Sequence, residues 1–191
     1  MKQTYTEDKT FTGTDFQKIA FEKGDYENCS FINCHFSNSD LSDAIFIDCN
    51  FSGCNLSLAK LVKTAFRDCK FKECKMLGLH FDDCNQFGLA FSFENCNLSH
   101  ASFYKMKIKN TIFKNSQLNE TDFAECDLTS SIFDNCDLSG ATFNNTILEK
   151  TDFRTAFNFT IDPEINRIKK AKFAIPSVLG LLNKYDIVIE N

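Results

Sequence analysis

The sequence predicts an all-β fold, a β-solenoid in which the chain winds as a square coil with one five-residue segment on each side. A large apolar residue recurs at every fifth position over residues 11–81, and the pattern resumes, shifted by two residues, over 93–153. Cysteines recur at a longer interval of twenty residues, as in Cys29, Cys49 and Cys69. Twenty residues make four segments, and a repeat of this length is typical of a solenoid.

A period of five fits neither regular alternative. An amphipathic helix places apolar residues three and four positions apart, and a half-buried strand places them two apart. A short extended segment followed by a turn does fit, because the central apolar residue and the residue two before it point to the same side. Successive coils would stack about 4.8 Å apart, as hydrogen-bonded strands do. One coil cannot cover its own core, so neighbouring coils must stabilise one another.

Two residue types fill the predicted interior. All 10 cysteines stand two residues before a central position, in an inward slot that Ala or Thr fills elsewhere, as at Ala141 and Thr121. Of the 22 phenylalanines, all but Phe87, Phe157 and Phe159 can occupy central positions, if Phe91 is counted as the last one before the shift. We therefore expect stacked rings along the axis, and reduced thiols that act as small apolar residues.

Taken in order, residues 1–10 are expected to form an N-terminal strand or cap over the first coil, since an open solenoid end exposes strand edges. Residues 11–173 form the coils. Residues 174–191 differ in kind: 177–184 predict a short helix with an apolar face, and Tyr185, Ile187 and Ile189 alternate as in a strand. This tail could cap the last coil or pair with a second copy by two-fold symmetry, and we expect it to do both. Its candidate dimerisation residues are Val178, Leu179, Leu181, Leu182, Tyr185, Ile187 and Ile189.

The repeat is interrupted near residues 85–92, where Gln86 falls at an expected central position and two extra residues must be absorbed. One interpretation is a bulged corner with a permissive backbone at Gly88. The other is a protrusion formed by Gln86, Phe87 and Gly88 that contacts a partner, because loops on rigid scaffolds often carry function.

Charge is uneven along the chain. The net charge of −5 argues against general binding to nucleic acid or to an anionic membrane. Residues 60–75 are rich in lysine, whereas 116–153 are acidic with a single base, Lys150. The acidic residues form a candidate partner-binding face: Glu120, Asp122, Glu125, Asp127, Asp134, Asp137, Glu149 and Asp152. The simpler interpretation of such a run is a solvated surface that keeps the protein soluble.

The sequence shows no recognisable catalytic or metal-binding motif. The cysteine spacings are not those of zinc sites, and the three histidines match no ligand pattern with them. No phosphate-binding loop, nucleophile elbow or metalloprotease helix is present, and carboxylates that recur with the repeat single out no acid–base pair. We expect no enzymatic activity, no cofactor and no metal. Without a signal-peptide pattern or an apolar run of about 20 residues, we expect a soluble cytoplasmic protein.

The words Cys96-Asn97-Leu98-Ser99-His100 and Cys136-Asp137-Leu138-Ser139-Gly140 resemble the pentapeptide-repeat family over nearly the whole chain. The resemblance implies a right-handed quadrilateral β-helix. The interruption, the length and the apolar tail look most like the quinolone-resistance (Qnr) and MfpA-type members. That resemblance implies a DNA-mimicking homodimer, joined through its tails, which binds DNA gyrase or topoisomerase IV and modulates sensitivity to quinolones.

The chain departs from some Qnr members in having no long loops, since residues 49–56 and 93–103 run through without an insertion. It therefore resembles a loop-less type. The lysines of 60–75 also interrupt a uniformly DNA-like surface. The alternative hypothesis is a pentapeptide-repeat scaffold that binds a protein other than a topoisomerase.

Overall fold

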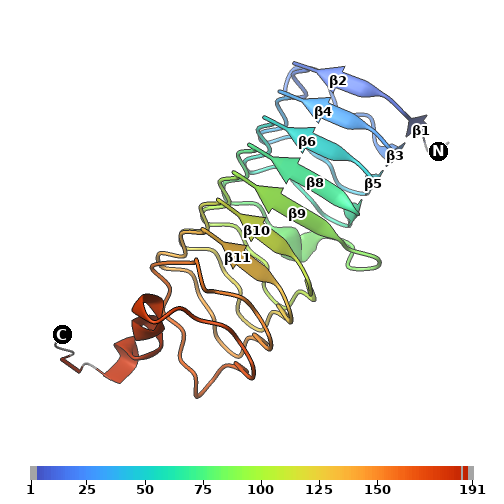
Figure 1. Ribbon diagram of the computed structural model, residues 1–191. Helices are drawn as coiled ribbons and strands as arrows, with labels where there is room; N and C mark the ends of the chain where they lie inside the picture. The colour runs from blue at the N-terminus through green and yellow to red at the C-terminus, as the bar shows by residue number, and fades with distance from the viewer. Residues whose placement is uncertain (1–3, 186, 189–191) are drawn as a thin grey trace.

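The computed structural model describes residues 4–185 and 187–188, and shows an all-β, right-handed quadrilateral β-helix (Figure 1). The predicted fold class is confirmed. The coils stack into a rod with the N-terminal coil at one end and a short helical tail at the other.

Two parallel sheets run along the rod, each on one of its four faces. The four-stranded sheet comprises β1 (Thr4–Glu7), β3 (Gly24–Glu27), β5 (Ile45–Ile47) and β7 (Ala65–Arg67). The seven-stranded sheet comprises β2 (Thr10–Thr12), β4 (Ser30–Ile32), β6 (Asn50–Ser52), β8 (Cys69–Lys72), β9 (Phe91–Glu94), β10 (Ile112–Lys114) and β11 (Ile132–Asp134). Within each sheet, residues twenty apart are partners, as Phe31 is with Phe51, except between β8 and β9, where partners are twenty-two apart. The other two faces are joined by single bridges, such as Asn55 with Lys75.

Stacked rings fill the interior, as the sequence predicts. Phe113 and Phe133 stack with centroids 4.9 Å apart and planes 3° from parallel. The small inward slots carry hydrogen bonds that link one coil to the coil before it. The Cys54 thiol donates to the carbonyl oxygen of Phe31 at 3.2 Å, and the Thr121 hydroxyl donates to that of Leu98 at 3.1 Å.

Most turns depend on a left-handed residue two positions after the central one. Asn28, Asp48 and Gly140 have φ values of 51°, 51° and 69°. Asn, Asp and Gly adopt this conformation more readily than other residues. The frequent Asn and Asp of the repeat therefore have a structural reason to be there.

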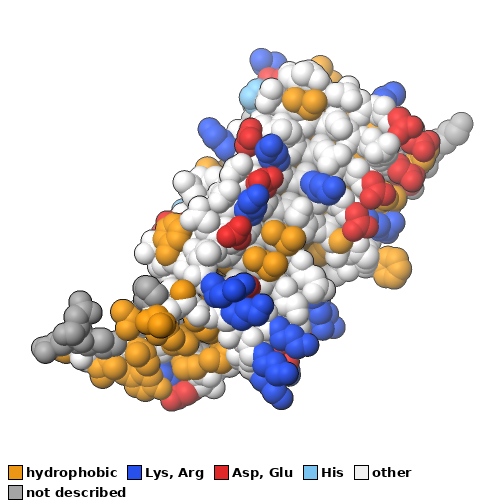
Figure 2. All heavy atoms as spheres, viewed as in Figure 1, with side chains coloured by type: hydrophobic (Ala, Val, Ile, Leu, Met, Phe, Trp, Pro, Cys, Tyr) orange, Lys and Arg blue, Asp and Glu red, His pale blue; other side chains and the backbone are white. Residues whose placement is uncertain are grey.

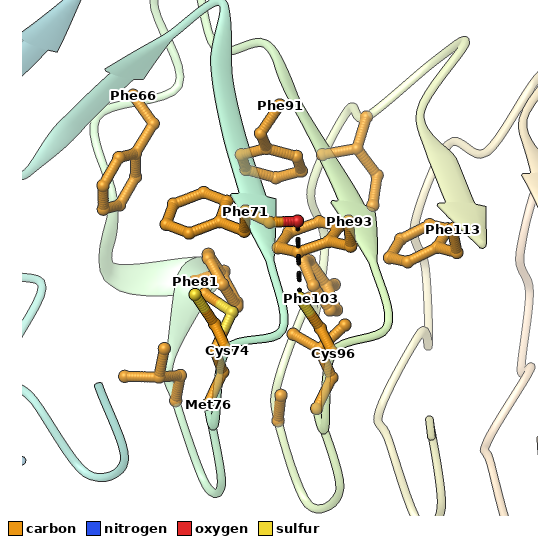
Figure 3. Close-up of a cluster of buried hydrophobic side chains, with 14 of the residues drawn as sticks. Phe66, Phe71, Cys74, Met76, Phe81, Phe91, Phe93, Cys96, Phe103 and Phe113 are labelled. Carbon is orange, nitrogen blue, oxygen red and sulfur yellow. Dashed lines mark hydrogen bonds between the residues drawn. The ribbon is translucent and has the colours of Figure 1, made fainter. Parts of the chain in front are cut away.

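The interruption is absorbed on the face of the four-stranded sheet. After the short 3₁₀ helix η1 (Phe81–Asp83), residues 85–88 project as an exposed loop, Leu89 packs back against the core, and β9 restores the register by pairing Phe91 with Cys69. Counting Phe91 as a central residue is therefore wrong, because it occupies the small inward slot of its coil. Its ring packs on Phe93 at 5.0 Å and on Phe81 at 5.5 Å, where the core would otherwise lack the missing central residue (Figure 3).

The tail folds back on the last coil through two 3₁₀ helices, η2 (Pro176–Leu181) and η3 (Asn183–Tyr185). A β-carbon at Gly180 would lie 2.3 Å from the carbonyl oxygen of Phe159, so only glycine permits this approach. Tyr185 lies in η3, and Ile187 and Val188, the described residues beyond it, are assigned to no strand, so the strand predicted from Tyr185 to Ile189 stays a prediction. Ile189 lies outside the described residues.

Candidate functional site: the charged surface of the rod

The eight acidic residues of 116–153 are distributed around the rod and not gathered on one face. Asp122, Asp127, Asp137 and Asp152 each bridge to a different column of the stack, one on each of the four faces. The other four lie beside these columns, at or near the turns: Glu120, Glu125, Asp134 and Glu149.

Half of these carboxylates pair with a lysine or an arginine. Asp127 pairs with Lys109 at 3.1 Å, Glu149 with Arg167 at 2.5 Å, and Asp152 with Arg154 at 2.7 Å. Glu125 lies 3.5 Å from Lys105, and Glu120 lies 3.3 Å from the His100 imidazole. The acidic stretch of the sequence therefore becomes a partly neutralised belt.

Several carboxylates also hold the turns that follow them. Asp127 accepts hydrogen bonds from the amide and the hydroxyl of Thr129, at 3.1 and 2.6 Å. Burial alone would raise the pKa of Asp127, but the two Thr129 donors and the Lys109 ammonium outweigh it and lower the pKa. For Asp137 burial is again outweighed, by the donors of Ser139, Asn119 and Asn158, and its pKa is lowered.

A second acidic group, not predicted from the sequence, follows one edge of the rod. This charged edge is the line along which the face of the four-stranded sheet turns into the seven-stranded sheet. In the N-terminal coils it consists of residues 7–8, 27–28, 47–48 and 67–68. A hollow of about 750 Å³ runs along it, lined by Glu7, Asp8, Glu27, Asn28, Asp48, Asn50, Asp68 and Lys70. Among the residues that the structure describes, Glu7, Asp48 and Asp68 have no ion-pair partner.

The same edge is basic beyond the loop of residues 85–90. There it consists of residues 109–110, 129–130, 149–150 and 169–170, flanked by Lys107 and Arg167. Lys107, Lys150, Lys169 and Lys170 form no ion pair with any described residue. Figure 2 shows red side chains grouped along this edge near the N-terminus and blue ones grouped along its continuation.

The loop of residues 85–90 lies between these two halves. Its tip, Phe87, is 79 % exposed, and the Arg67 guanidinium lies 5.8 Å from the centre of its ring. The turn is held by the Asn85 carboxamide oxygen, which accepts from the Phe87 amide at 3.0 Å. Gly88 has φ +68°, which a residue with a side chain rarely adopts. Gln86, Phe87 and Gly88 are thus brought together on a projection from the rod, as one of the two interpretations of this segment expects.

The tail presents a second apolar surface. Val178, Leu179, Tyr185 and Ile187 are 37–55 % exposed. Leu181 and Leu182 are half-buried, and Leu181 packs against the core. Lys184 fixes the tail to the last coil through Asp162 and Glu164, both at 2.7 Å.

The thiols lie inside the rod. All ten cysteines are buried and free, and burial raises the pKa of Cys49 and of Cys136 to about 12. Thiols in this state are poor nucleophiles. Within the described part of the chain, no three His, Cys, Asp or Glu side chains are grouped so that they could hold a metal ion. No helix among residues 4–185 is long and apolar enough to cross a membrane.

Comparison with known proteins agrees with this architecture. The model of the pentapeptide repeat region matches residues 24–92 and 90–156. The chain belongs to the pentapeptide-repeat family. A search of curated proteins finds no match.

Among solved structures, the chain is similar to HetL, a pentapeptide-repeat protein involved in heterocyst differentiation regulation in the cyanobacterium Nostoc sp. strain PCC 7120. The TM-score is 0.56 at 14% identity, over 91% of this chain and 85% of HetL. It is also similar to full-length QnrB1, a plasmid-mediated fluoroquinolone resistance protein, with a TM-score of 0.48 at 20% identity over 96% and 100% of the two chains. At these identities the likeness concerns the fold.

The acidic half of the charged edge could have been found in the sequence. Asp8, Asp48 and Asp68 obey the same twenty-residue spacing as the cysteines, with Asn28 in the remaining place. Charges that are close together in the sequence indicate the acidic belt of residues 116–153. Charges that recur every twenty residues, and so lie next to one another in the stack, indicate the acidic edge.

Proposed function

We propose that this chain is a non-enzymatic, DNA-mimicking scaffold of the cytoplasm that binds DNA gyrase or topoisomerase IV and modulates quinolone sensitivity, without a cofactor. The proposal is supported by the membership in the pentapeptide-repeat family and by the resemblance of the interruption and the tail to Qnr and MfpA-type members. We place the proposed interface on the charged surface of the rod.

The observation that carries the proposal is the acidic half of the charged edge. On the face of the four-stranded sheet and the turn that follows it, the N-terminal coils hold six carboxylates, Glu7, Asp8, Asp25, Glu27, Asp48 and Asp68, and one guanidinium, Arg67, while Lys70 of the adjoining strand β8 also lines the hollow. Four coils span about 14 Å, so the carboxylates occur about once per 2.5 Å of axis, compared with about one phosphate per 1.7 Å in duplex DNA. A groove that binds DNA would meet a similar line of charge on a rigid rod.

Two further surfaces complete the proposed interface. The projection of Gln86, Phe87 and Gly88 offers an exposed aromatic beside the acidic edge, the kind of residue that anchors protein interfaces. Of the acidic belt, Glu120 and Glu125 have the most exposed carboxylates and would contribute at the margin of the interface.

We also propose that the exposed residues of the tail join two copies end to end. That pairing predicts that Leu179→Asp/Leu182→Asp is monomeric by light scattering at micromolar concentration in about 500 mM salt, where the native chain is still a dimer.

The test is a supercoiling assay with gyrase, and a decatenation assay with topoisomerase IV, over a titration of this protein with and without ciprofloxacin. We expect restored supercoiling in the presence of the drug, or inhibition in its absence. No effect on either enzyme at tens of micromolar would overturn the proposal.

A second candidate is a scaffold for a protein other than a topoisomerase. The basic half of the charged edge favours it, because Lys150, Lys169 and Lys170 would repel the cationic channel of a DNA-binding enzyme. A partner that carries both signs of charge would fit the whole edge. Retention of such a partner on immobilised protein, together with silence in both topoisomerase assays, would favour this candidate.

A further inference from the structure

We propose that the charged edge pairs with the same edge of a second copy, antiparallel and side by side, so that the acidic half of each copy lies on the basic half of the other. The two halves are matched in length. Four coils precede the loop of residues 85–90 on this face, centred on Thr6, Tyr26, Phe46 and Phe66, and four follow it, centred on Ile108, Leu128, Leu148 and Ile168. The eight coils can be numbered 1 to 8 along the chain. A two-fold axis through the loop then places coil 1 of one copy on coil 8 of the other, coil 2 on coil 7, coil 3 on coil 6 and coil 4 on coil 5.

The charges are complementary under this operation. In the N-terminal half, we count the residue on either side of each central residue of this face and the turn residue that follows. These positions carry six carboxylates and one guanidinium, a net charge of −5 (1 − 6). Those of the C-terminal half carry Lys107, Lys109, Lys150, Arg167, Lys169 and Lys170 against Asp127 and Glu149, a net of +4 (6 − 2). The axis brings Glu7 and Asp8 opposite Lys169 and Lys170. Electrostatic complementarity of this kind selects one orientation of the partner.

The shapes agree with the charges. The acidic half is hollowed along its length, whereas the basic half bears long lysine side chains that can enter that hollow. A smaller hollow of about 380 Å³ continues along the edge past the loop, and Asp68, Ala90, Lys109 and Asn110 are among its lining residues. Figure 2 shows an apolar projection between the red and the blue groups.

Phe87 occupies the centre of the proposed pair. The two-fold axis passes through its loop, so the 79 % exposed ring of one copy meets that of the other. In protein interfaces, buried aromatic residues at the centre usually contribute most of the binding energy, and the polar rim contributes little. Arg67, over the ring of Phe87, would be covered with it.

The size of the edge predicts a weak dimer. Eight steps of about 4.8 Å give a length of about 38 Å, and a strand of three to four residues gives a width of about 10–13 Å, so the pair would bury about 800–1,000 Å² in total. That is the range of weak, transient interfaces. The pairing does not depend on topoisomerase binding. The further consequence that a pair cannot bind the enzyme, because its acidic edge is covered, rests on the proposed function.

The test is sedimentation equilibrium of Leu179→Asp/Leu182→Asp, which removes pairing through the tail. We expect a dimer with a micromolar Kd in about 50 mM salt that weakens at least about tenfold in about 500 mM salt, because salt screens exposed charges. In this background, Glu7→Lys/Asp8→Lys and Lys169→Glu/Lys170→Asp should each weaken the dimer at least about tenfold. The four substitutions together should restore the Kd to within about threefold, since each repelling contact becomes attractive again.

The matched control is Lys60→Glu/Lys75→Glu, which changes the net charge by the same amount as Lys169→Glu/Lys170→Asp on the two faces away from the edge. It should shift the Kd by less than about threefold. Phe87→Ser should weaken the dimer without changing its salt dependence. A monomer at several hundred micromolar in low salt, or single reversals that act no more strongly than the control, or a fourfold variant that fails to recover, would overturn the proposal. Circular dichroism of each variant verifies the fold.

Discussion

The coils before the loop of residues 85–90 and the coils after it share one interior but differ in almost everything else. One column of phenylalanines runs through both halves, with Phe51 on Phe71 at 4.8 Å and Phe113 on Phe133 at 4.9 Å. The second column changes face at the loop, from Phe46 on Phe66 at 5.4 Å to Phe103 on Phe123 at 5.3 Å. The first half carries two sheets and holds seven of the ten cysteines in its small slots, more than any other residue type there. The second extends only the seven-stranded sheet and uses Thr, Ser and Ala in most of these slots.

The difference in surface charge is more instructive. In the second half most carboxylates are held by cations or by turn amides, whereas in the first half the acidic edge is concave and largely without cationic partners. The repeat determines the interior independently of the surface. A surface can thus change sign from one coil to the next at little cost to the core.

The largest expected effect tests the claim that both halves share one core. Phe51 and Phe123 are 1 % and 0 % exposed. Phe51→Ala and Phe123→Ala should each lower the free energy of unfolding by about 3–5 kcal/mol, because each leaves a cavity in a stack of rings. Urea denaturation followed by circular dichroism measures this, with Lys72→Ala as an exposed control. A near-neutral result in one half only would show that its interior is packed differently.

The two ends of the rod can be compared through two glycines. A β-carbon at Gly24 would lie 2.2 Å from the Thr4 carbonyl oxygen, and one at Gly180 would lie 2.3 Å from that of Phe159. Gly24→Ala should detach β1 and Gly180→Ala should detach η2, each costing about 1–3 kcal/mol. Hydrogen exchange should show faster exchange of residues 4–7 in the first variant and of 176–185 in the second. Unchanged protection in either variant would contradict the close approach at that end.

A smaller effect separates the two kinds of inward slot. Thr121→Cys replaces a hydroxyl donor with a weaker thiol donor and should cost about 1 kcal/mol. Cys54→Thr makes the reverse exchange and should be close to neutral, since both residues donate to a carbonyl of the preceding coil. A loss of several kcal/mol in Cys54→Thr would mean that the first half cannot accept the methyl group, and that the slots are not equivalent.

The smallest effect is a dependence on pH in the second half. The pKa of Asp127 is lowered in the folded state, so the folded protein holds fewer protons on it than the unfolded chain does near pH 4. Its contribution to stability is complete above the unfolded value of about 3.9 and is lost as the pH falls through the lower folded value. Asp127→Asn should therefore show a shallower loss of stability between about pH 4 and pH 2. If the free energy of unfolding of the variant falls with pH as steeply as that of the native chain, the role assigned to Asp127 is contradicted.

The sequence predicts the interior of the rod better than its surface. The five- and twenty-residue periods predict the coils, the ring stacks and the buried thiols, because these depend only on distance along the chain. The place of Phe91 is not predicted, since the path by which two extra residues leave the core depends on the coils on either side. The surface is predicted least well. Asp122 and Asp127 are five residues apart but on different faces, whereas Asp48 and Asp68 are twenty apart and adjacent.

The most direct test of the account asks which acidic residues a topoisomerase recognises. Asp8→Asn/Asp48→Asn/Asp68→Asn removes three of the five carboxylates of the acidic edge, using the residue that position 28 already carries there. Asp122→Asn/Asp134→Asn/Asp137→Asn removes the same charge from the belt of the second half. In the gyrase supercoiling assay, the edge variant should need at least about tenfold more protein for half-maximal effect, and the belt variant less than about threefold more. Equal losses, or a larger loss in the belt variant, would contradict the assignment of the acidic edge.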